Sequence, residues 1–216
     1  MTRTTPPESA PRRIGLMGGS FDPVHAAHVR LAEVALHTLA LDEVRWIPVG
    51  QPWQKARQLA SAEHRLAMVR LATAHEPRFV VDPIETLRSG PSYTLDTVRE
   101  LQQADRATVP AQWFLIIGQD QYANLPTWHG WPELLERVTL AVACRGDAPP
   151  QTPAALQGVA HHCQTLPLPP MRVSSTDIRA RLARGESPQS LGDAMASEAV
   201  ARYIANHQLY APGDHR

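Results

Sequence analysis

A short apolar strand pattern near the N-terminus leads directly into a glycine-rich turn and then into a helix pattern. The strand pattern covers Ile14–Met17, the turn reads GGSFDPVHAAH from Gly18 to His28, and the helix pattern covers Val29–Leu39. Glycines let the backbone approach a ligand closely, and the unpaired N–H groups at a helix N-terminus attract anions. The stretch therefore predicts a strand, turn and helix that together bind an anion such as phosphate.

Two histidines accompany this turn. His25 and His28 are three residues apart, which places them on one face of a helix, and Pro23 fixes φ where the helix begins. Partly exposed helix histidines or zinc ligands are the alternatives, although the helical zinc motif requires a Glu directly after its first histidine. The turn is neither a P-loop, which needs a Gly-Lys-Ser/Thr ending, nor a dinucleotide fingerprint, whose glycines are spaced differently. Phosphate binding by two imidazoles is the favoured interpretation.

Strand and helix patterns alternate along the rest of the chain. Apolar strand runs are predicted at Val44–Val49, Phe79–Val81, Trp113–Ile117 and Val138–Ala143, with a further short strand near His161–Leu166 in a proline-rich connection. Helices are predicted from Ser61, within Gly90–Leu101 with Ser92 or Thr94 as the N-cap, and over Val173–Leu182 and Glu198–His207. This alternation predicts a doubly wound, Rossmann-like α/β fold: a parallel sheet with helices on both faces and a small C-terminal helical part at about residues 173–210.

Composition narrows the organisation and the partners. Residues 1–12 are rich in Pro, Thr and Arg and are predicted to form a flexible tail before one domain at 13–216. The 21 basic and 21 acidic residues balance, so the charge pattern of a general nucleic-acid binder is missing and a small ligand is favoured. Two cysteines and an N-terminus without an apolar signal core favour a cytoplasmic protein that has no membrane partner. A homo-oligomer is compatible with the sequence.

Other candidate site residues are predicted at the same edge of the sheet, because parallel sheets bind ligands at the carboxyl ends of their strands. Lys55 lies in the loop after the second strand run, and Gly118 and Asp120 follow the fourth. Lys55 could instead be an ordinary surface lysine, and Asp120 an ordinary turn carboxylate. Glu85, Arg88 and Arg145 are interpreted as solvated or loop charges without a role in the site.

Two further motifs also have two interpretations. The residues Ser174, Ser175 and Thr176 precede a helix that carries Arg179. They predict either an ordinary N-cap with a solvated arginine or a helix N-terminus that binds phosphates together with a guanidinium. Trp128, in PTWHGW, is either a core residue or a stacking surface for a ligand ring.

These motifs carry a family resemblance. GGSFDPVHAAH, IPVGQPWQK, RSGPSYTLDTV, FLIIGQD, LPTWHGW and VSSTDIRARL resemble, in the same order, the motifs of bacterial nicotinate-nucleotide adenylyltransferases, from Arg13 to about Tyr210. The first and last motifs belong to the wider nucleotidyltransferase superfamily and indicate the reaction type, whereas the middle ones indicate the substrate. Two departures stand out: Ala27 replaces the usual Gly before the second histidine, and Pro52–Lys55 lacks a second proline and a histidine before the lysine.

The resemblance implies transfer of the adenylyl group of ATP to nicotinate mononucleotide in NAD biosynthesis, with Mg²⁺ bound mainly through the ATP phosphates and no protein metal ligand. The implied catalytic residues are His25, His28, Lys55 and Arg179. The implied ATP-binding residues are Gly18, Gly19, Ser20, Phe21, Gly118, Asp120, Ser174, Ser175 and Thr176. Tyr93, Thr94 and Trp128 are implied to bind the nicotinate. An enzyme preferring nicotinamide mononucleotide and a catalytically silent nucleotide-binding regulatory module are the alternatives.

Overall fold

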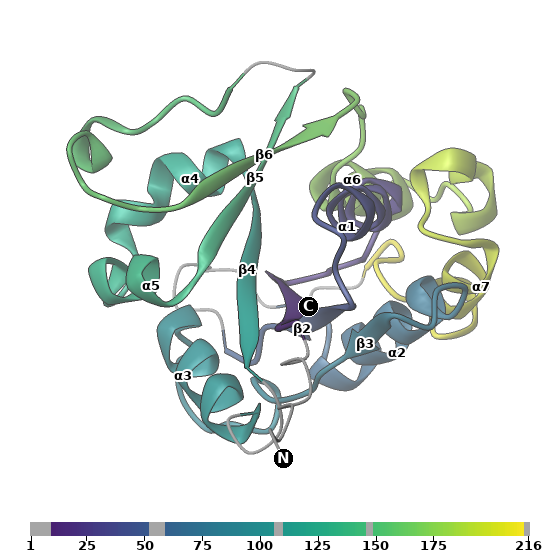
Figure 1. Cartoon of the computed structure of the whole chain (residues 1–216). Helices are drawn as coiled ribbons and strands as arrows, with labels where there is room; N and C mark the ends of the chain where they lie inside the picture. Colours follow the sequence, from purple (N-terminus) through teal and green to yellow (C-terminus); the bar gives the residue numbers. More distant parts are fainter. Residues whose placement is uncertain (1–9, 52–58, 106–109, 146–148, 214–216) are drawn as a thin grey trace, which may run out of the picture.

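In the computed structural model, which describes residues 10–51, 59–105, 110–145 and 149–213, six parallel strands form one sheet (Figure 1). Its order is β3-β2-β1-β4-β5-β6. The strands are β1 (Arg12–Gly19), β2 (Glu43–Pro48), β3 (Phe79–Val81), β4 (Ala111–Gly118), β5 (Thr139–Arg145) and β6 (Cys163–Leu168). Because the strand order changes direction between β1 and β4, a crevice is expected at the carboxyl ends of these two strands.

Helices cover both faces of the sheet, which confirms the predicted doubly wound fold. Figure 1 shows α3 (Thr94–Asp105), α4 (Gln119–Asn124) and α5 (Trp131–Arg137) on one side of the strands. On the other side lie α1 (Ala26–Thr38), α2 (Ala62–Thr73), α6 (Ser175–Ala183) and α7 (Glu198–Asn206). Short 3-10 turns complete the described elements: η1 (Leu125–Thr127), η2 (Ala154–Leu156) and η3 (Pro188–Ala194).

The sheet separates two hydrophobic cores. Alternate residues of a strand point to opposite faces, so Met17 of β1 packs in the core under α1, α2, α6 and α7, while its neighbour Leu16 packs in the core under α3 and α5. Trp46 is fully buried in the first core and Leu140 in the second. Both cores pack against β1, the strand that leads into the turn, so the turn has a rigid base.

Most element boundaries differ from the sequence prediction by one to three residues, as in β1, which extends two residues beyond Ile14–Met17 at each end. The first helix begins at Ala26 rather than Val29, with His25 as its N-cap in extended backbone. Ser92 does not cap α3, because its buried hydroxyl has no hydrogen-bond partner in the described part of the chain, and Thr94 is already helical. Ala27, the departure from the usual motif, is the second residue of α1.

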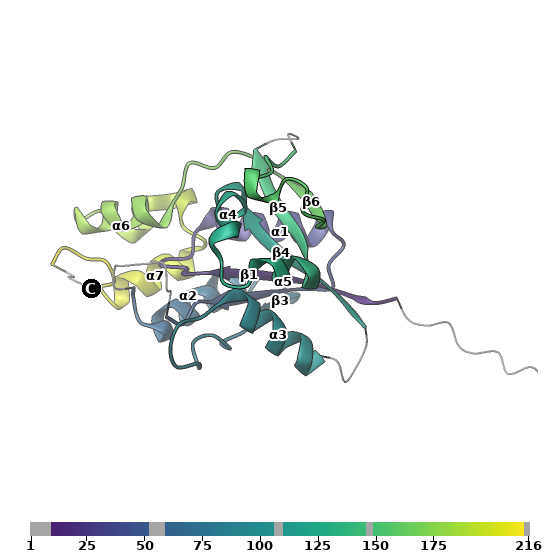
Figure 2. The ribbon, with the colours of Figure 1, turned by 90° about the vertical axis from the view of Figure 1, so that its left-hand side faces the viewer.

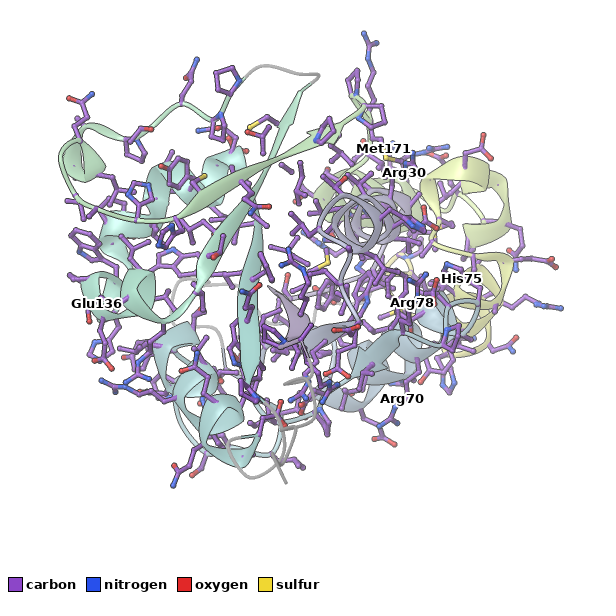
Figure 3. The ribbon with its side chains drawn as sticks, in the orientation of Figure 1. Arg30, Arg70, His75, Arg78, Glu136 and Met171 are labelled. Atoms are coloured by element: carbon purple, nitrogen blue, oxygen red, sulfur yellow. The ribbon has the colours of Figure 1, made fainter. Side chains whose placement is uncertain are left out.

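The C-terminal helices lie at the carboxyl end of the sheet. Figure 2 shows α6 and α7 on the side toward which β1 runs, away from the start of that strand. Several charged side chains lie on the outer surface: Figure 3 shows Arg30 on α1, Arg70, His75 and Arg78 near α2 and β3, and Glu136 on the opposite side at α5. None of the helices formed by the described residues has the length and apolar character needed to cross a membrane.

Candidate active site

A cavity of about 400 Å³ opens at the carboxyl ends of β1, β2 and β4. Among the predicted site residues, its lining includes Gly18, Gly19, Ser20, His28, Tyr93, Thr94, Gly118 and Trp128. The cavity therefore joins the turn after β1 to the N-terminus of α3, at the point where the strand order reverses. This is the place where doubly wound sheets bind ligands.

The two histidines lie together at the start of α1. Their rings stack with centroids 3.7 Å apart, and Phe21 meets the His28 ring edge-on at 5.1 Å. The backbone N–H of His25 donates to Nδ1 of His28 over 3.2 Å. Because Nδ1 accepts this bond, a neutral His28 carries its proton on Nε2. His28 therefore has an N–H donor at Nε2.

His25 is the more buried of the pair, with 7% of its surface exposed. Desolvation by burial lowers the pKa of His25 from its usual 6.5 to about 4, against a smaller opposing effect of a backbone hydrogen bond. Its Nδ1 is buried and has no hydrogen-bond partner among the described residues. At neutral pH His25 is therefore an uncharged imidazole.

This burial predicts acid sensitivity. The unfolded chain binds a proton at His25 near pH 6.5 and the folded chain near pH 4, so the contribution to stability is complete above 6.5 and is lost as pH falls toward 4. We expect the wild-type protein to lose about 3 kcal/mol of unfolding free energy more than a His25→Asn variant between pH 7 and 4. Urea denaturation at a series of pH values measures this difference, and parallel curves for the two proteins would contradict it.

The SSTDIR segment contacts the turn directly. Oγ of Ser175 donates to the carbonyl of Pro23 over 2.9 Å, and Nη1 of Arg179 donates to the carbonyl of Asp22 over 2.6 Å. Ser174 is an ordinary N-cap, accepting from the N–H of Asp177, and Thr176 accepts from Nη2 of Arg179. The segment thus brings the N-terminus of α6 and a guanidinium beside the turn after β1.

At its other end the cavity meets the first turn of α3. Tyr93 and Thr94 line it there, and the Tyr93 ring packs against His129 with centroids 4.6 Å apart. Trp128 is half-buried, and its Nε1 is buried without a hydrogen-bond partner in the described ranges. This end therefore combines a helix N-terminus, which favours an anion, with a large aromatic surface.

The interpretation of Glu85 as a solvated charge is wrong. Glu85 is only 7% exposed, lines the cavity and accepts a hydrogen bond from Thr97 over 2.8 Å. Burial raises the pKa of its carboxyl group, and bonds from Thr97 and the Gly50 amide, with the charge of Arg88, act in the opposite direction. A β-carbon at Gly50 would lie 2.0 Å from the Glu85 carbonyl oxygen, so only glycine fits there. The local sequence holds no signal of this long-range packing.

Arg65 is a second buried charge that the sequence did not single out. It is 2% exposed, and its guanidinium donates to the carbonyl groups of Ala60, Ser20 and Gly50 at 2.9, 3.1 and 3.4 Å. It therefore links the start of α2 to the turn after β1 and to the loop after β2. A buried arginine that satisfies backbone carbonyls stabilises the shape of the cavity rim.

The structure does not place two of the predicted residues in this cluster. Asp120 is exposed in the first turn of α4 and is not among the residues that line the cavity. Lys55 and its neighbours Pro52–Gln54 lie outside the described residues, as does most of the predicted tail. The roles of Asp120 and Lys55 stay predictions.

The chain is similar to known nucleotidyltransferases over most of its length. Residues 16–181 match the cytidylyltransferase-like family. A Methylibium petroleiphilum protein named "Probable nicotinate-nucleotide adenylyltransferase" is 55% identical over 94% of this chain and 95% of its own. The chain belongs to the nicotinate-nucleotide adenylyltransferase family. A Bordetella petrii protein with the same name is 49% identical over 92% of this chain and 99% of its own.

Solved structures agree with the nicotinate-nucleotide adenylyltransferase fold. The Plasmodium falciparum nicotinic acid mononucleotide adenylyltransferase complexed with NaAD superimposes with a TM-score of 0.76, covering 95% of this chain and 98% of that one. The two sequences are 16% identical, so this likeness shows the fold alone. Family membership confirms the sequence-based identification of this chain as a nucleotidyltransferase.

Proposed function

We propose that this chain transfers the adenylyl group of ATP to nicotinate mononucleotide, forming nicotinate adenine dinucleotide and pyrophosphate in NAD biosynthesis. One observation carries the proposal: a continuous cavity of about 400 Å³ reaches from Gly18, Gly19 and His28 to Tyr93, Thr94 and Trp128. A phosphate site at one end and an anion-favouring aromatic site at the other suit the two parts of this reaction. The names of the similar proteins support the same assignment.

The reaction joins two phosphates without a covalent enzyme intermediate. An oxygen of the mononucleotide 5′-phosphate attacks the α-phosphorus of ATP in line, and the bond to the bridging oxygen of pyrophosphate breaks. Acceleration comes mainly from positioning and from stabilising charge on the phosphate oxygens. His28, donating from Nε2, and the neutral His25 are proposed to hold the α-phosphate and the bridging oxygen. Gly18, Gly19, Ser20 and Gly118 are proposed to shape the ATP site, and Phe21 to support it by packing on the His28 ring.

The departing pyrophosphate is proposed to be held by α6. Its N-terminal N–H groups, the hydroxyls of Ser174, Ser175 and Thr176 and the guanidinium of Arg179 suit the β- and γ-phosphates. Ser175 and Arg179 bond to backbone carbonyls of the turn, which supports a position beside the α-phosphate site. Lys55 is proposed to add positive charge from the loop after β2, as the family motif implies.

The acceptor base is proposed to lie against Trp128. Its carboxylate would meet the N–H groups at the first turn of α3, beside Tyr93 and Thr94. A helix N-terminus favours a negative charge, so the carboxylate of nicotinate gains more there than the neutral carboxamide of nicotinamide. This asymmetry supports the nicotinate substrate over the nicotinamide alternative.

Mg²⁺ is proposed to bind mainly through the phosphates of ATP, whose charge it neutralises, because this ion keeps several waters and takes few protein ligands. The cavity wall near the turn offers imidazole, hydroxyl and amide groups, which suit phosphate oxygens better than the metal itself. Asp120 is proposed to act near the ribose or the metal-bound phosphates. A cytoplasmic location and homo-oligomerisation stay predictions.

A paired substrate assay tests the function. With ATP and Mg²⁺, pyrophosphate release measured with each mononucleotide should give a kcat/KM for nicotinate mononucleotide about tenfold or more above that for the amide, corresponding to about 1.4 kcal/mol. Equal or better use of nicotinamide mononucleotide would overturn the substrate assignment. Binding of ATP without turnover of either mononucleotide would favour the regulatory module.

A further inference from the structure

The carboxyl group of Asp22, in the middle of the turn after β1, is completely buried. Its Oδ1 accepts a hydrogen bond from the hydroxyl of Tyr210 over 2.7 Å and another from the backbone N–H of Ala60 over 3.2 Å. Tyr210 lies 188 residues further along the chain, just after α7. The C-terminal segment therefore reaches back to the phosphate turn through one side chain.

Unusual backbone conformations occur at Tyr210 and at Phe21, the residue before Asp22. Phe21, next to Asp22, has a φ of 46°, and Tyr210 has a φ of 62°. Bulky residues in this left-handed region cost about 1–3 kcal/mol each and persist where the surrounding structure holds them in place. Leu209, only 2% exposed in the core beneath α7, holds the backbone of Tyr210. Tyr210 thus keeps a costly conformation while its hydroxyl contacts Asp22.

The C-terminal helical part makes further contacts with the same turn. Ser175 and Arg179 bond to the carbonyls of Pro23 and Asp22, and the backbone of His25 forms an isolated antiparallel bridge with Met195. These bonds all act on the main chain. The bond from Tyr210 acts on the one acidic side chain between Phe21 and His25, where burial makes the loss of a hydrogen-bond donor costly.

We propose that Tyr210 is a positioning residue for adenylyl transfer. Its hydroxyl fixes Asp22, and Asp22 in turn holds the segment that sets His25 and His28 against the α-phosphate. The inference rests on the proposed function. A misplacement of about 1 Å between catalytic groups can lower the rate about a hundredfold, so a device that fixes this turn has kinetic value.

The test compares Tyr210→Phe with Tyr203→Phe. Tyr203 is the matched control because its hydroxyl also bonds across elements, to Nδ1 of His64 over 3.0 Å, but it contacts α2 rather than the turn. We expect Tyr210→Phe to lower kcat about tenfold while KM for nicotinate mononucleotide stays within about twofold, since the acceptor pocket lies against α3. Tyr203→Phe should keep the wild-type kcat, whatever its change in Tm.

Turnover by the wild-type protein is measured first. If the wild type forms no product, the proposed function fails, and this result says nothing about Tyr210. With an active wild type, an unchanged kcat in Tyr210→Phe, or an equal loss of kcat in Tyr210→Phe and Tyr203→Phe, would overturn the positioning role.

If Tyr210→Phe fails to fold, Asp22→Asn and Asp22→Ala take its place. The amide oxygen introduced by Asp22→Asn still accepts from the tyrosine, so this variant should retain at least about three times the kcat of Asp22→Ala. Equal kcat values in these two variants would contradict the proposal.

Discussion

Replacing His28 by alanine is expected to lower kcat about a hundredfold to a thousandfold, with a change of less than about fivefold in the Kd for ATP. The reason is geometric. Nδ1 of His28 is occupied by the N–H of His25, so Nε2 is the ring donor that can serve a phosphate oxygen at the cavity wall. A donor aimed at charge that develops during the reaction stabilises the transition state far more than bound ATP.

His37 provides the matched control for this variant. It lies near the end of the same helix, is exposed, and sits outside the residues that line the cavity. His37→Ala should therefore keep wild-type kinetics. Single-turnover rates and ATP titration of both variants separate chemistry from binding. A His28→Ala protein with wild-type kcat would contradict this role, and weaker ATP binding in such a protein would make His28 a ground-state contact.

Removing the Trp128 side chain is expected to raise KM for nicotinate mononucleotide about tenfold or more, with KM for ATP nearly unchanged. Stacking of an aromatic side chain on a base contributes about 1–3 kcal/mol, and about 1.4 kcal/mol is one factor of ten. Trp128 lines the cavity next to His129, whose ring packs against Tyr93. Steady-state kinetics with each substrate varied in turn give the two KM values.

Trp131→Ala serves as the comparison. Trp131 packs against the same hydrophobic core as Trp128, yet it begins α5 and is not among the cavity-lining residues. The Trp131→Ala substitution should lower the Tm without changing KM for the mononucleotide. If Trp128→Ala instead behaves like Trp131→Ala, Trp128 is a core residue and the alternative interpretation of the PTWHGW motif holds.

The fold was predictable because its signals are local. Parallel strands buried on both faces appear as continuous apolar runs, as in Trp113–Ile117, which is buried throughout within β4. The short run Phe79–Val81 also matches β3 in full. The sequence predicts the start of α1 three residues too late, because histidine is an unusual N-cap and His25 to His28 have no apolar periodicity. The short strand predicted near His161–Leu166 is found as β6, shifted by two residues, and its pairing with β5 depends on the completed sheet.

The candidate site was predictable only in part, because several of its interactions link distant segments. The turn and the α3 terminus could be found from motifs, and the cavity joins them. Burial of Glu85 depends on Gly50 and Thr97, and the bond between Asp22 and Tyr210 spans 188 residues. Neither contact leaves a pattern in the neighbouring sequence. Lys55 lies beyond the described ranges and remains a prediction.

The two hydrophobic cores have a consequence for how this protein can diverge. The phosphate turn leads into α1 over one core, whereas the acceptor end of the cavity rests on α3 over the other, with the sheet between them. Substitutions around α3 therefore repack the core on the opposite side of the sheet from α1, the helix that carries His28. Selectivity for the acceptor can drift through mutations around α3 while the chemical step is inherited unchanged.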